Sequence, residues 1–239
     1  MRKLMALILL LLLPLLTACG AAESEEPFSA KFTIRPEEEP TDVYYDLTYN
    51  EETRQLRSDA LDAAAVRTLF AQSLFGDEGK TAIRWVSPVR YTLTGRYTSE
   101  DARTVSDLAA SLRHISGFPD MRPSADDEGN LRIHFEPSAE IVFLPAVDEA
   151  GRIQSVQISI PSDWDTAKRS AALHRNLMRA CGFFYTSSAA LDSVLSGETP
   201  SAMLSDADYL LLETLYGSIE PGDTKESCLE KLDRDLRGE

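Results

Sequence analysis

Residues 131–136 read Leu-Arg-Ile-His-Phe-Glu, and residues 156–160 read Val-Gln-Ile-Ser-Ile. Apolar and polar side chains alternate in both stretches, which is typical of β-strands that bury one face. The short apolar run 141–144 predicts another strand between them. Residues 89–94, Val-Arg-Tyr-Thr-Leu-Thr, alternate in the same way. The sequence therefore predicts a β-sheet of about four strands.

Helical patterns surround these strands. Helices are predicted over 58–76 and 99–117, each with a serine cap at its start and a glycine at its end. Ser-x-x-Asp capping boxes open predicted helices over 162–181 and 205–217, and a last helix follows Thr224. From residue 89 onward the predicted order is β-α-β-β-β-α-α-α. The expected fold is α+β, one mixed sheet packed with helices and a helical C-terminal part.

The N-terminus has the parts of a secretory signal peptide. Residues 1–3 are Met-Arg-Lys, residues 4–16 are almost wholly apolar, and small residues precede Cys19. The apolar run is shorter than the roughly 20 residues of a membrane-spanning helix. The ending Leu-Thr-Ala-Cys at 16–19 resembles the lipobox of bacterial lipoproteins.

That resemblance implies that the signal peptide is residues 1–18 and that Cys19 becomes an acylated N-terminus, modified with fatty acids such as palmitate. It implies an extracytoplasmic protein that is anchored to the cell membrane by lipid. The alternative is an ordinary signal peptide with an incidental cysteine.

The remainder divides where its composition changes. Residues 19–27 are small and acidic after the cysteine and predict a flexible tether. Residues 28–57 contain two stretches that favour extended chain around a proline-bounded loop, and they predict an N-terminal strand segment or appendage. Residues 58–239 contain the other elements and predict one main domain, which is long enough to bury a core without metal or disulfide.

The chain is acidic, with 39 Asp and Glu residues against 24 Lys and Arg residues and a net charge of −15. This balance argues against nucleic acid as a partner, because phosphate binding needs clustered cations. It also argues against adhesion to an anionic membrane beyond the lipid anchor. The expected partners are the membrane, through the lipid on Cys19, and a peptide or protein of the cell envelope.

Two cysteines remain after Cys19. Cys181 and Cys228 can form a disulfide in an exported protein, or they can be two buried thiols that pack as small apolar residues. No Cys-x-x-Cys spacing occurs in the sequence, so a cysteine zinc site is not predicted.

Residues 175–185, Arg-Asn-Leu-Met-Arg-Ala-Cys-Gly-Phe-Phe-Tyr, resemble the zinc helix of the metzincin peptidases, whose pattern is His-Glu-x-x-His-x-x-Gly-x-x-His. Gly182 stands at the position where that family turns sharply after the helix. Residues 204–208 and 215–217 are similar to a helix near the end of many metzincins. The resemblance implies a zincin-like fold.

The zinc chemistry of that family does not carry over. Arg175 and Arg179 occupy two ligand positions, Asn176 the base position and Tyr185 the third ligand position. Arginine stays protonated and offers no lone pair, whereas zinc needs neutral imidazoles and the reaction needs a glutamate base. Starting the frame at His174 restores neither. No catalytic residue, metal or cofactor is predicted.

A second resemblance covers about residues 58–222. Phe-Gly-Asp-Glu at 75–78, Trp85 and Pro-Val at 88–89, with the 204–216 region and Pro-Gly at 221–222, are similar to the exported bacterial family known as domain of unknown function 2927. That family resembles zincin peptidases in outline and has no established activity. It implies an inactive zincin-like pseudopeptidase with a binding or structural role.

Two other functions stay open, a cell-envelope hydrolase with an unrecognised site, resembling a metallopeptidase, and a solute-binding lipoprotein. One positive hypothesis concerns the arginines. Arg175 and Arg179 are four residues apart on one helix face, where they could hold a carboxylate of a peptide C-terminus or an acidic glycan. The alternative is that they pair with local acids, for which the candidates are Asp163, Asp206 and Asp208.

Overall fold

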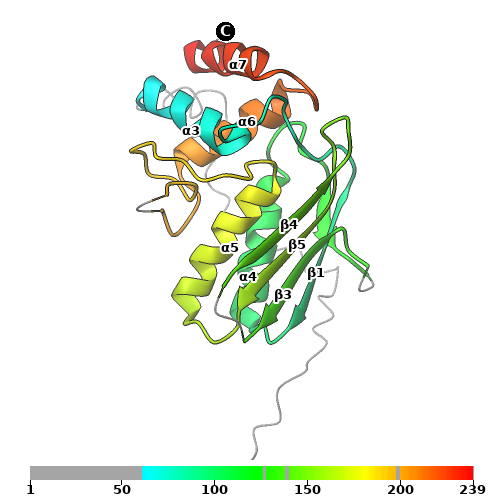
Figure 1. Cartoon of the computed structure of the whole chain (residues 1–239). Coiled ribbons are helices and arrows are strands. Elements are labelled where there is room, and N and C mark those ends of the chain that lie inside the picture. The colour runs from blue at the N-terminus through cyan, green and yellow to red at the C-terminus, as the bar shows by residue number, and fades with distance from the viewer. Residues whose placement is uncertain (1–60, 126–127, 138–139, 198–199, 239) are drawn as a thin grey trace, which may run out of the picture. The chain divides into compact units, whose positions relative to one another are not determined.

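A five-stranded mixed sheet forms the centre of the computed structural model, which describes residues 61–125, 128–137, 140–197 and 200–238 (Figure 1). The strand order is β2-β1-β3-β5-β4, in which β4 alone is antiparallel to its neighbour. The strands are β1 (Val89–Gly95), β2 (Met121–Pro123), β3 (Leu131–Glu136), β4 (Val142–Val147) and β5 (Ile153–Pro161).

The predicted strands are present, and one strand was missed. Residues 121–123, which the sequence predicts as part of a polar loop, form β2 beside β1. Three residues are too few to show an alternating pattern, and only the parallel partner strand β1 holds them extended. The prediction of about four strands is therefore corrected to five.

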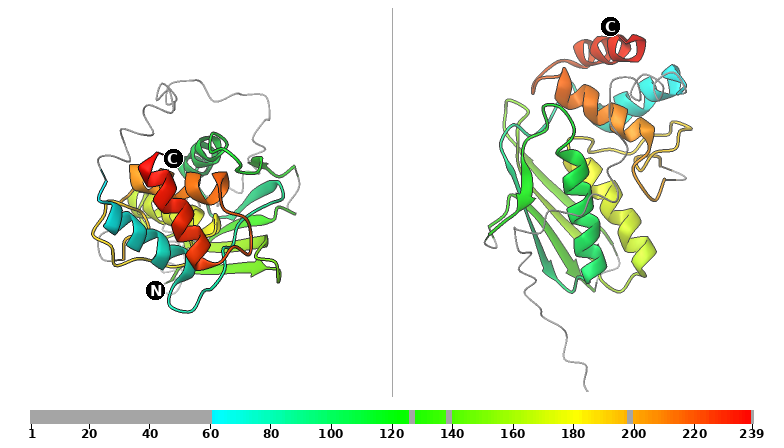
Figure 2. Two further views of the ribbon diagram at one scale, coloured as in Figure 1. Left: turned by 90° about the horizontal axis from the view of Figure 1, so that it is seen from above. Right: turned by 180° about the vertical axis from the view of Figure 1, so that it is seen from behind.

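The five helices of the described ranges lie in two groups. Helices α4 and α5 lie side by side along one face of the sheet, and α3, α6 and α7 gather beyond one end of it (Figures 1 and 2). The helices are α3 (Ala63–Phe75), α4 (Ser99–Leu112), α5 (Thr166–Ala180), α6 (Asp206–Gly217) and α7 (Lys225–Arg237). The predicted α+β class is confirmed.

The alternation of β3 explains how the sheet buries one face. Leu131, Ile133 and Phe135 are at most 2% exposed, whereas Arg132 and Glu136 are exposed. Removing three such side chains from water stabilises the fold by about 5–8 kcal/mol before the entropy of ordering the chain is counted.

The helix caps agree with the sequence in part. Ser205 and Asp208 form the predicted capping box of α6, and Thr224 caps α7. Helix α4 is capped by Thr98 in place of Ser99, because Thr98 bonds reciprocally with the residue three places on. Asp165 alone caps α5, so the predicted box with the serine three residues earlier is absent there.

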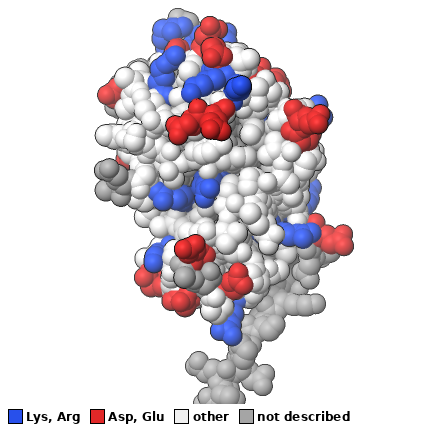
Figure 3. Space-filling view, viewed as in Figure 1, with Lys and Arg blue, Asp and Glu red and all other residues white. Residues whose placement is uncertain are grey.

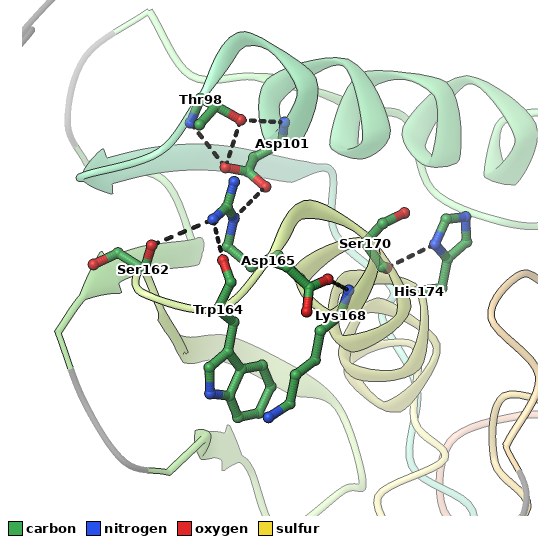
Figure 4. Close-up of polar contacts among 9 residues, drawn as sticks. Thr98, Asp101, Ser162, Trp164, Asp165, Lys168, Ser170 and His174 are labelled. Carbon is green, nitrogen blue, oxygen red and sulfur yellow. Dashed lines mark hydrogen bonds and ion pairs between the residues drawn. The ribbon is translucent and has the colours of Figure 1, made fainter.

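A buried ion pair joins the starts of α4 and α5 (Figure 4). The Arg169 Nε donates to Asp101 Oδ1 at 3.0 Å, and the two side chains are 8% and 1% exposed. The other carboxylate oxygen of Asp101 accepts from the Thr98 main chain and hydroxyl, both at 2.8 Å. Arg169 also donates to the Ser162 and Trp164 carbonyls. This network ties α5 to α4 and to the segment that follows β5.

Cys181 and Cys228 are free, buried thiols, so the structure has the second of the two alternatives and not the disulfide. Burial raises the pKa of both thiols, that of Cys228 to about 12 with a further contribution from Asp223. Neither is therefore a reactive thiolate at neutral pH.

Several predictions fall on residues outside the described ranges. They are the signal peptide 1–18, the lipidation of Cys19, the tether 19–27 and the segment 28–57. The predicted serine cap at residue 58 is wrong, because α3 begins at Ala63 and is capped by Asp62, whose carboxylate accepts from the Ala64 and Ala65 amides. In the part of the chain that is described, no helix is long and apolar enough to cross a membrane.

Candidate functional site

The chain turns sharply at Gly182, at the end of α5. Gly182 has a φ of 123°, and a Cβ atom placed on it would lie 2.3 Å from the Ile83 carbonyl oxygen. Only glycine fits both conditions. The last carbonyls of α5 are satisfied by side chains, since Trp85 donates to Ala180 at 2.8 Å and Tyr216 to Cys181 at 2.7 Å.

Beyond this turn, residues 183–197, which we call the strap, lie against α5. The strap closes on itself, because the Ser187 amide donates to Leu195 and the Gly197 amide donates back to Ser187, at 2.8 and 2.7 Å. Gln72 of α3 accepts from Ser187 and Ser188.

Arg175 holds the strap from α5. Its Nε donates to the Val194 carbonyl at 2.7 Å, and its Nη2 donates to the Ser196 carbonyl. Val194 is 0% exposed and Ser196 4% exposed, so these are buried acceptors that need a donor.

Arg179 joins α5 to the start of the strap and to the edge strand. Its Nε donates to the Phe184 carbonyl and its Nη1 to Asn176 Oδ1, both at 3.0 Å. Its guanidinium carbon lies 4.1 Å from the centre of the Phe143 ring on β4. Phe143 in turn packs edge-on against Phe184, with ring centres 5.7 Å apart. The guanidinium is thereby held in one plane.

None of the ion pairs found among the described residues involves Arg175 or Arg179. Asp208 holds the other side of the strap, accepting from the Ser193 hydroxyl at 2.5 Å and the Val194 amide at 3.1 Å. The predicted pairing with local acids is therefore not what these ranges contain, and main-chain carbonyls take its place.

Both guanidiniums lie in a partly desolvated setting. Burial lowers the pKa of Arg175, and burial together with the charge of Arg175 lowers the pKa of Arg179. The two residues lie four places apart on α5, a spacing at which like charges repel each other. On the face viewed in Figure 1, basic side chains adjoin near the middle and are surrounded mainly by uncharged residues (Figure 3).

The other residues compared above with the metzincin pattern have structural partners. Asn176 is 1% exposed and donates to Ala172 while it accepts from Arg179. His174 Nδ1 lies 2.9 Å from the Ser170 carbonyl (Figure 4), and burial lowers its pKa. Tyr185 is 47% exposed and its ring covers Gly76. Over the described ranges, no three His, Cys, Asp or Glu side chains are grouped to hold a metal ion.

The neighbouring edge strand presents apolar surface. Val142 is 40% exposed and Leu144 56% exposed, on either side of Phe143 in β4. Among the described strands, β4 pairs only with β5, so its other edge is open until Pro145, which has no amide hydrogen to donate.

These residues can bind an anion, but they do not form a recognisable catalytic group. Ser193 donates its hydroxyl to Asp208, but it is 0% exposed, so a substrate could not reach it as a nucleophile. The sequence matches no protein-family model and has no significant match among curated proteins.

Proposed function

We propose that this protein is a lipid-anchored, extracytoplasmic binding protein whose main domain captures a ligand bearing a carboxylate. The observation that carries the proposal is the pair Arg175 and Arg179. They lie one helical turn apart, repel each other, and have no carboxylate partner among the described ion pairs. In a chain of net charge −15, two neighbouring cations that form no ion pair among the described residues favour an anionic partner.

The ligand that best fits the surroundings is a peptide in extended conformation. The open edge of β4 offers main-chain hydrogen bonds up to Pro145, and Val142 and Leu144 offer apolar contact. Arg179 reaches this strand through Phe143. A terminal or side-chain carboxylate of the peptide would then meet the cations.

We further propose that the domain is a zincin-like pseudopeptidase. The turn at Gly182 and the capping box at Ser205 support this, since both stand where the resemblance requires them. Arg175 and Arg179 at the ligand positions support a loss of zinc chemistry, because each donates hydrogen bonds there and neither can accept a metal.

A binding assay tests the ligand class. The full-length protein in detergent is titrated against a five-residue valine–alanine peptide, labelled at its N-terminus with an uncharged dye, and against its C-terminal amide. Tighter binding of the carboxylate form, reduced about tenfold or more by Arg179→Gln, is expected because a hydrogen bond to a charged group contributes about 1.5–3 kcal/mol. Arg103→Gln, an exposed change on α4, is the control.

Equal binding of the two peptides, or of the two variants, would reject a carboxylate site. Stoichiometric zinc in the same purified protein would favour the hydrolase alternative. The anchor is tested separately. In a bacterial host, labelled palmitate should be incorporated into the wild-type protein and not into Cys19→Ser. Equal labelling of the two proteins would show that Cys19 is not the lipidated residue and would favour an ordinary signal peptide.

A further inference from the structure

Arg175 and Arg179 each make two hydrogen bonds, but the groups that accept them differ. Both acceptors of Arg175 are strap carbonyls, those of Val194 and Ser196. Its Nε and Nη2 form one edge of the guanidinium, the edge that would grip a carboxylate side-on. That edge is occupied by the protein itself.

The burial of the strap shows how firmly this edge is committed. Val194 and Leu195 are 0% exposed, and Ser196 is 4% exposed. Asp208 holds the same residues from α6 through the Val194 amide. A ligand that took the Arg175 edge would have to unpack two apolar side chains and leave two buried carbonyls without donors.

Arg179 has a different setting. One acceptor, Asn176, lies on its own helix, and the other is the carbonyl of the half-buried Phe184. One face of its guanidinium rests on Phe143, which belongs to the exposed edge strand. Its Nη2 makes no hydrogen bond among those found in the described ranges. Because Phe143 covers one face of the guanidinium, a carboxylate can reach its N–H groups only near the guanidinium plane.

We propose that the two arginines divide the work of the site: Arg179, oriented by the ring of Phe143, contacts the ligand carboxylate, and Arg175 is a positioning residue that fixes the strap as the wall of the site. This inference rests on the proposed function. It assigns Phe143 a role in specificity that no sequence pattern indicates, because a lone phenylalanine in a strand is ordinarily a packing residue.

The test uses the ratio of the carboxylate affinity to the amide affinity for the peptide pair above. A substitution that only loosens the protein weakens the binding of both peptides to the same extent. The ratio of the two affinities therefore reports contact with the carboxylate. Arg179→Gln should reduce the ratio to about one, a loss of roughly tenfold or more. Phe143→Leu should reduce it about three- to fivefold, and Phe143→Tyr, which keeps the ring, should retain it.

Arg175→Gln should leave the ratio within about threefold of the wild type while hydrogen exchange of the strap amides at 193–196 accelerates at least tenfold. Arg175→Lys should fall between the wild type and glutamine in exchange, because lysine donates without the planar fork. The assignment would be overturned if Arg175→Gln brought the affinity ratio to about one while Arg179→Gln left it at the wild-type value. It would also be overturned if hydrogen exchange of the strap amides were unchanged in Arg175→Gln. A ratio of one in the wild type would instead reject the proposed function.

Discussion

Glu213 should make the protein less stable as the pH rises. This side chain of α6 is 9% exposed, and burial, with a further contribution from Asp235 of α7, raises its pKa from 4.5 to about 7. The folded state therefore holds a proton on Glu213 that the unfolded chain releases at lower pH. Stability from this group is present at low pH and is lost as the pH rises toward 7.

The size of the effect follows from the two pKa values. With 4.5 unfolded and about 7 folded, the ionised group costs roughly 1.4 kcal/mol at pH 5.5 and at most about 3.4 kcal/mol at pH 8.5. Glu213→Gln removes the charge at every pH and nearly preserves the shape. Its gain in unfolding free energy should therefore grow by about 2 kcal/mol between these pH values.

Urea unfolding followed by the fluorescence of the buried Trp85 measures this at pH 5.5, 6.5, 7.5 and 8.5. Glu230→Gln, an exposed change on α7, is the matched control and should leave the pH dependence as it is. The reasoning fails if Glu213→Gln destabilises the protein at pH 8.5, or if its unfolding free energy keeps the same slope against pH as the wild type.

Three further changes test the packing. Asp101→Asn leaves Arg169 buried without a counter-charge and should cost about 3–5 kcal/mol in urea unfolding, and a cost under 1 kcal/mol would mean that the pair is not buried in solution. Gly182→Ala should lose about 1–3 kcal/mol or more, whereas Gly217→Ala, whose added Cβ would meet nothing within 4 Å, should change stability little; equal effects would contradict the turn geometry. The two buried cysteines should react with a thiol reagent only after unfolding, and rapid reaction of the native protein would show that they are accessible.

The regular elements were predictable because their patterns are local. The alternation in β3 and β5, the capping box of α6 and the Thr224 cap of α7 each depend on residues a few places apart. Such patterns act before any tertiary contact forms. Strand β2 was not predicted, because three residues are too few to show an alternating pattern and only the pairing with β1 holds them extended.

Several contacts described above join residues far apart in the chain, which is why the sequence could not supply them, whereas the hydrogen bonds of Arg179 go to residues only three and five places away. Arg175 reaches carbonyls 19 and 21 residues away, and Asp101 pairs with Arg169 across 68 residues. Main-chain carbonyls leave no trace in side-chain patterns, so the expectation that the arginines would meet acids named the wrong acceptors. The cation–π contact with Phe143 was equally hidden, because β4 gave only a short apolar run.

The choice of arginine at these two positions has a consequence for how the site is held. A histidine offers at most two nitrogens, whereas a guanidinium offers five N–H groups, enough to hold two carbonyls and keep donors in reserve. Arg175 and Arg179 each use two of their nitrogens on fixed acceptors, so their planes are set before any ligand arrives. Little rotamer freedom is then lost on binding, which favours affinity. The bonds of Arg179 to Phe184 and Asn176 therefore set its plane for an anion, whereas Arg175 contributes by holding the strap in place.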